Sequence, residues 1–383
     1  MPRRRATSRG HRAPQRHIQS NADKDSKLKA EIVSRLHDSQ PLASILLSRP
    51  SRFLARKVHR PSLCSFLVKL VVALIPLALG PTLPFLTSDL HAEWLLLLFI
   101  ISLATLCSLI GLEDAVEGWA RGAEPIVNLL PEERDLLRFD SWVQWAFDPI
   151  KQAAAALTCA FCFLATVAVA AWVGSFNMPL SVYAGALLPA LVIGNGFYWG
   201  IITPRGITTI CKCAAMKVYV NDPVNTPGIV RLSSIAGAHS RIGAVMVVVA
   251  SVAFLYVGLQ GPSNAFMATL AIWFLLGLAN ELYVFFYPHY HLYTVVSREK
   301  LRLLLRIQGM IEAMYPEMEL MGKETVTAMV DAVTLYDSLK STSASRLRFR
   351  DWFQHISSAA TPVLLVILAE LPDWQSIRTV LLH

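Results

Sequence analysis

The sequence predicts an all-α, polytopic membrane protein with about six transmembrane helices in three hairpins, followed by a cytoplasmic helical hairpin. The chain has 383 residues, of which 54% are hydrophobic and only 16% are charged. This apolar content exceeds what the core of one water-soluble domain needs. The apolar residues also gather in runs of about 20, the length that an α-helix needs to cross roughly 30 Å of hydrocarbon.

Six such runs lie within residues 63–288, and we expect this region to form the transmembrane domain. The predicted spans are 65–86, 93–112, 152–174, 180–203, 242–260 and 265–287. Pro76, Pro81 and Pro84 lie in the first run, so we expect it to be kinked or partly unwound toward its outer end. Because the link within each pair of runs is short, the pairs predict three helical hairpins.

The distribution of basic residues predicts the orientation of these hairpins. Lys and Arg are absent from the links 87–92, 175–179 and 261–264, and they are frequent in the other loops and in both terminal segments. Because basic loops stay on the cytoplasmic side, we expect both termini to be cytoplasmic. The expected location is the cell (inner) membrane. The mitochondrial inner membrane is the alternative, because the Arg-rich N-terminal residues resemble a presequence, and no cleavable secretory signal is predicted.

Three segments outside the predicted spans have distinct compositions. Residues 1–28 are polar and basic, so we expect a disordered arm. Residues 29–62 mix apolar and basic positions, which fits either short helices on an anionic membrane surface or a solvated linker. Residues 113–151 are expected to form amphipathic helices at the level of the lipid headgroups, where indole rings are favoured. The tryptophans of that segment are Trp119, Trp142 and Trp145.

The C-terminal part of the chain is predicted to hold a cytoplasmic helical hairpin and a membrane-contacting segment. Residues 289–350 show apolar positions at helical spacing, interrupted at Tyr315 and Pro316. Residues 351–383 contain one short apolar core within 353–371. Since that core is too short for a standard crossing, we expect an interfacial or re-entrant segment, and a seventh crossing is the alternative.

Ionisable residues inside membrane spans are functional candidates because burial of charge is costly, and the predicted spans contain two good ones. Lys69 lies near the cytoplasmic end of the first span, and its long stem could carry the ammonium group to water. Glu281 lies nearly two turns inside the sixth span and reaches less far. A Lys69–Glu281 ion pair would relieve both costs. Glu281 is then either a helix-packing contact or a proton- or cation-responsive carboxylate near a cytoplasmic vestibule.

Spans four and six share an Asn and a Tyr three residues apart, each followed by a proline. Residues at this spacing lie on one helix face, so each pair could hydrogen-bond to another helix. A duplicated hairpin or chance could explain the likeness. With the two ionisable residues, the candidate intramembrane polar site comprises Glu281, Lys69, Asn195, Tyr198, Asn280 and Tyr283. Close helix packing is the expected role of the glycines Gly185, Gly194, Gly196, Gly243 and Gly277.

No catalytic motif, metal-binding spacing or cofactor fingerprint is found, so no catalytic residue, metal or cofactor is predicted. The net charge of +8 lies in segments that flank apolar runs, which favours membrane orientation over nucleic-acid binding. Cys211 and Cys213 lie in a basic loop that could lower thiol pKa values and permit palmitoylation or metal binding. Structural roles remain the alternative for both thiols.

Two functional hypotheses follow from the sequence. The first is a membrane-anchored interaction or signalling component that uses its cytoplasmic helical face. Its expected partners are the lipid bilayer and either a cytoplasmic protein or a second copy of the chain. The alternative is a channel or transporter, motivated by the six spans, the proline-rich first span and the carboxylate of Glu281.

Overall fold

The computed structural model describes residues 13–39, 61–82, 92–174, 180–213, 216–259, 264–314 and 323–343, with scattered positions between 42 and 53. These residues form helices joined by short turns, and no strand occurs among them. The predicted all-helical class is therefore confirmed for this part of the chain. The predictions for residues 1–12 and 351–383 fall outside the described residues.

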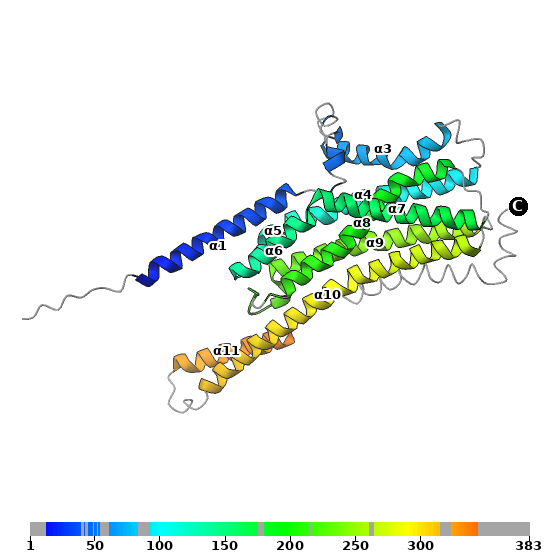
Figure 1. Ribbon diagram of the computed structural model, residues 1–383. Helices are drawn as coiled ribbons and strands as arrows, with labels where there is room; N and C mark the ends of the chain where they lie inside the picture. Colours follow the sequence, from blue (N-terminus) through cyan, green and yellow to red (C-terminus); the bar gives the residue numbers. More distant parts are fainter. Residues whose placement is uncertain are drawn as a thin grey trace, which may run out of the picture.

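Six apolar helices make up the bundle in Figure 1. They are α3 (Pro61–Thr82), α4 (Ala92–Arg121), α7 (Pro149–Val173), α8 (Leu180–Cys211), α9 (Pro227–Leu259) and α10 (Asn264–Met314). By length and composition, five of them could cross a membrane: α4, α7, α8, α9 and α10. The apolar part of α3, Ser62–Ala78, is shorter. The structure therefore supports a multi-pass membrane protein with five clear candidate spans.

Four bundle helices extend well beyond the predicted spans, and the first of them, α4, ends at Arg121 instead of residue 112. Helix α8 continues through Pro204 to Cys211, and α10 continues through Pro288 as one helix of 51 residues. Both prolines are buried. A proline removes one backbone donor, and packing on both sides of it can outweigh that loss. Helix α9 begins at Pro227, fifteen residues before the predicted start, because proline suits the first position of a helix.

A layer of three further helices lies at one end of the bundle. It consists of α1 (Ala13–Asp38), α5 (Ala123–Val127) and α6 (Glu133–Ala146), and we call it the basal layer. Its core is continuous with that of the bundle ends and includes the fully buried side chains of Trp119, Leu130 and Ile207. The Trp119 ring lies 4.7 Å from the ring of Trp142, between centroids. These two indoles are therefore buried inside the protein, and their expected headgroup placement is wrong.

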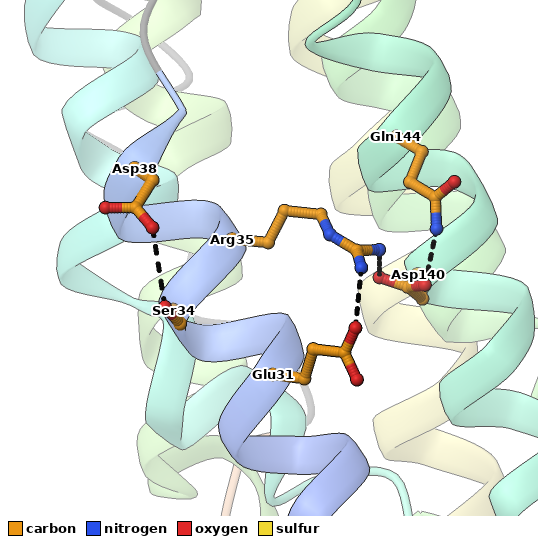
Figure 2. A network of polar contacts seen from close by, with 6 residues as sticks. All are labelled: Glu31, Ser34, Arg35, Asp38, Asp140 and Gln144. Atoms are coloured by element: carbon orange, nitrogen blue, oxygen red, sulfur yellow. Dashed lines mark hydrogen bonds and ion pairs between the residues drawn. The ribbon is translucent and has the colours of Figure 1, made fainter.

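Helix α1 packs against α5 and α6 through apolar and charged contacts, and Figure 2 shows the charged ones. Ile32 and Leu36 are buried in the shared core. Arg35 forms an ion pair with Asp140 of α6, and its guanidinium group also lies 3.0 Å from Glu31. Residues 29–38 of the segment that was expected to lie on the membrane or remain solvated are thus packed on protein, whereas the described side chains of Ile45, Leu46 and Phe53 are exposed. Residues 13–28, expected to be disordered, continue the same helix.

The apolar contacts of α1 should hold it more strongly than its ion pair does. Leu36→Ala removes a side chain with 1% exposure. We expect it to lower the stability of the packed α1 by about 2–5 kcal/mol. Arg35→Ala removes a partly exposed ion pair with Asp140. We expect it to lower the same stability by about 1 kcal/mol or less. The rate of tryptic cleavage within residues 13–38 measures the release of the helix. Leu46→Ala, at an exposed position, is the control. Faster cleavage in the Arg35 variant than in the Leu36 variant would contradict this ranking.

At its far end, α10 leaves the bundle and pairs with α11 (Lys323–Ser341). We call residues 297–314 and 323–343 the arm. The Nζ atom of Lys300 donates to the carbonyl oxygens of Lys340 at 3.0 Å and Thr342 at 2.5 Å, which satisfies acceptors at the end of α11. One uninterrupted helix therefore connects the interior of the bundle to the arm.

Candidate functional site

A cavity of about 350 Å³ lies between α4, α7, α8, α9 and α10. Its wall is mostly apolar, with Leu97 and Phe266 toward one end and His239 and Glu281 toward the other. Along α9 the lining runs from His239 to Val257, a span of 18 residues or about 27 Å at 1.5 Å per residue. The cavity is thus long and narrow, and its polar groups gather at the end nearer the basal layer.

Glu281 lies at this polar end with 3% of its surface exposed. The Ser240 hydroxyl donates to its Oε1 at 3.0 Å. A Cβ atom at Gly243 would lie only 2.3 Å from Oε2, so the absence of a side chain on α9 gives the carboxyl group its place. A hydroxyl donor and a notch in the facing helix therefore hold the carboxyl group at the cavity.

The expected ion pair between Lys69 and Glu281 is wrong. Lys69 of α3 is buried and pairs with Glu113 of α4. Helix α3 packs against α4 and α8, whereas α10 packs against α7, α8 and α9, so the two residues lie on helices that do not adjoin. The sequence placed Lys69 and Glu281 at a similar depth in the bundle. A similar depth does not show that their helices are neighbours. Lys69 is therefore not part of the cavity.

The two asparagines of the repeated pattern have different surroundings. Asn280 lines the cavity beside Glu281, and its Nδ2 atom lies against α8, where a Cβ on Gly200 would come within 2.6 Å. Asn195 is buried next to the cavity lining, and among the described residues its Oδ1 atom has no hydrogen-bond partner. Only Asn280 belongs to the cavity.

The two tyrosines do not form equivalent contacts either. The hydroxyl of Tyr198 donates to the carbonyl oxygen of Ala146 at 2.9 Å, which ties α8 to the end of α6. The ring of Tyr283 stacks on that of Tyr287, one turn along α10, with centroids 4.9 Å apart. Among the described residues, the interhelical hydrogen bond expected for both pairs is found for Tyr198. The structure therefore gives no support to a duplicated hydrogen-bonding site.

His239 is a residue of the site that the sequence interpretation missed. It is buried at the polar end of the cavity, where its Nε2 atom lies 3.0 Å from the hydroxyl of Thr203. Its Nδ1 atom lies 3.3 Å from the carbonyl oxygen of Ile235. The predicted fifth span began after His239, so the residue was assigned to a loop. Pro227 preceded by a Thr was the available signal for an earlier helix start.

The glycines of the bundle fall into two groups. Close packing is confirmed for Gly185, Gly194 and Gly243, where an added Cβ would meet a neighbouring helix at 2.8 Å or less. Gly196 and Gly277 differ, because an added Cβ would find no heavy atom within 4 Å, and both residues line the cavity. For these two, the packing explanation is wrong. They keep the cavity open.

The charge inventory of the lining is simple. Its titratable side chains are Cys159, His239 and Glu281, and none of the described lining residues is Lys or Arg. Nor do the described residues include a group of three His, Cys, Asp or Glu side chains that could hold a metal ion. The cavity thus combines an apolar wall with one carboxyl group and hydrogen-bonding groups at one end, which suits a ligand with an apolar body and a polar end.

Cys213, outside the bundle, does not have the lowered thiol pKa that its basic loop suggested. Burial, together with the nearby carboxylate of Asp135, raises the pKa of Cys213 to about 12. Because the thiolate is the reactive form, Cys213 should resist alkylation by iodoacetamide at pH 8 in the folded protein. The same thiol should react readily after unfolding, which peptide mass spectrometry measures. Rapid modification of the folded protein would contradict this expectation.

Comparison of the chain with protein-family models, with curated proteins and with solved structures finds no match.

Proposed function

We propose that the protein is a membrane transport protein whose substrate passes through the cavity between α4, α7, α8, α9 and α10. The observation that carries the proposal is the position of Glu281, a buried carboxyl group at the polar end of that cavity. Ionisable residues inside membrane bundles are costly and are most often retained for function. A carboxyl group used only for helix packing would need no cavity beside it.

The proposed topology has six spans, with α3 as the first, and places both termini in the cytoplasm of a cell membrane. Helix α3 has 22 residues, enough to cross the hydrocarbon core. The basic residues of the loops support the orientation. Helix α7 supports the membrane setting, because it turns large apolar side chains outward, including Trp172 with 82% exposure. Such a surface fits lipid and is unusual in water.

A flux assay tests the transport function. The purified protein is reconstituted into liposomes, and the movement of protons, rubidium and ethidium is followed under gradients of either sign. We expect at least one of these probes to cross faster than in protein-free liposomes. Glu281→Gln should lower that rate about tenfold or more, equivalent to about 1.4 kcal/mol of lost stabilisation. Absence of protein-dependent flux for all three probes would contradict the proposal.

Glu312→Gln is the matched control for this assay. Glu312 lies on the same helix as Glu281 but is exposed in the arm, where Gln308 donates to it at 2.8 Å. The substitution removes the same carboxyl group without touching the cavity. Flux through this variant should equal that of the unmodified protein. An equal loss in both variants would assign the effect to the overall charge of the protein.

An interaction or signalling role is the second candidate, and the arm is the observation that favours it. Leu301 and Leu305 of α10 and Val326, Val330 and Val333 of α11 are exposed apolar side chains at helical spacing. A photo-activatable cross-linker placed at Leu305 in cells should give a defined adduct, of dimer size for a second copy or of another size for a different protein. The same cross-linker at Glu312 is the control. No adduct at Leu305 would remove this candidate.

A further inference from the structure

We infer that the cavity binds a single-chain amphiphile with a compact cationic head, such as a long-chain alkylamine or alkylammonium ion. In this arrangement the head lies at Glu281, and the chain extends along the apolar wall between α4, α7, α9 and α10. The inference rests on the proposed function, because it names the substrate class of the same site. Three features of the cavity carry it.

The first feature is the charge at the polar end. Glu281 supplies a carboxyl group, and the described lining residues supply no Lys or Arg. An anionic head would therefore meet an acidic side chain in an apolar setting, and no Lys or Arg among the described lining residues could balance its charge. A phosphate-bearing lipid headgroup encounters the same difficulty. A cationic head instead gains the attraction of the carboxyl group, which a surrounding of low dielectric strengthens.

The second feature is the aromatic and amide environment of this end. Phe197 and Trp199 line the cavity on α8, next to Gly200, which adjoins the Asn280 amide. Aromatic rings attract ammonium groups, including quaternary ones that cannot donate a hydrogen bond. Asn280 adds a side-chain oxygen that can accept a hydrogen bond from a primary amine. The cavity lining on α8 and the Asn280 amide are therefore also suited to a cationic head.

The third feature is the shape of the apolar part. Its length of about 27 Å along α9, combined with a volume of about 350 Å³, accommodates one extended alkyl chain. Gly196 and Gly277 leave the wall clear on α8 and α10, because a Cβ on either would point into open space. A bulky side chain at either position should occupy the space of the chain.

Equilibrium binding tests the inference without any transport measurement. The full-length protein in phosphatidylcholine nanodiscs is titrated with radiolabelled dodecyltrimethylammonium, and displaceable binding is measured. We expect saturable binding that dodecylamine displaces, whereas dodecyl sulfate and dodecylphosphocholine, with the same chain, do not at equal concentration. Glu281→Gln should weaken the affinity about tenfold or more, and Gly277→Leu should abolish it. Glu312→Gln should bind like the unmodified protein.

Equal displacement by all three competitors, or no saturable binding, would overturn the inference. The displacement series uses the unmodified protein, so it decides the question even if Glu281→Gln fails to fold. The result of the binding experiment can be distinguished from the result of the flux assay. Saturable cation binding without flux of dodecyltrimethylammonium or of the three other probes supports the ligand class and contradicts transport. Glu281-dependent flux of rubidium or protons without dodecyltrimethylammonium binding supports transport and overturns the ligand class.

Discussion

Trp119→Ala is expected to lower the free energy of unfolding by about 3–5 kcal/mol, the usual cost of truncating a fully buried aromatic side chain. Trp119 has no exposed surface, and its ring packs against Trp142 and against Phe139, with centroids 6.3 Å apart in the second pair. Helix α1 and the ends of α4, α8 and α9 share this core. Loss of the indole should therefore loosen the basal layer as a whole.

Two variants separate the loss of packing from other effects of the substitution. Trp119→Phe keeps an aromatic ring and removes an Nε1 donor that has no hydrogen-bond partner among the described residues, so it should cost much less than the alanine change. Trp145→Ala removes an indole with 38% exposure and should cost little. The temperature at which the monodisperse protein is lost, followed by size-exclusion chromatography, ranks the variants. If Trp145→Ala lowered that temperature as far as Trp119→Ala, the central role of this core would be refuted.

The helical class and the membrane setting were predictable from sequence because they depend on composition and on the length of apolar runs. The ends of helices depend on finer effects. Pro204 and Pro288 were read as helix ends, since proline removes one backbone donor. In the structure both are buried within continuous helices, because contacts on either side outweigh that local loss. The 51-residue α10 could not be inferred from local signals alone.

The candidate site was predictable in part for a related reason. Glu281 was identified because a carboxyl group deep in an apolar run is conspicuous in any sequence. Its surroundings come from α8 and α9, and sequence does not specify which helices adjoin. Lys69 was therefore paired with the wrong partner, and the contact between Glu281 and Ser240 was missed. Whether a glycine faces a helix or a cavity is likewise a tertiary property, and only the structure separates these cases.

Gly194→Leu and Gly196→Leu are expected to have opposite effects, although they make the same change two residues apart on α8. At Gly194 an added Cβ would lie 2.8 Å from the carbonyl oxygen of Ala156 on α7, so leucine must push two backbones apart. Overpacking of this kind typically costs about 1–3 kcal/mol, and a contact with backbone cannot be relieved by a rotamer change. Helices α7 and α8 should then separate, and the protein should lose thermal stability.

At Gly196 the leucine side chain has space, because an added Cβ would find no heavy atom within 4 Å. Leucine is a better helix former than glycine by roughly 0.5–1 kcal/mol, so thermal stability should be unchanged or slightly higher. The same side chain occupies the cavity, so both flux and displaceable binding of dodecyltrimethylammonium should fall. Thermal stability and flux measured on both variants give the comparison. A stable Gly196→Leu variant with full flux and full binding would mean that this cavity is not the substrate path.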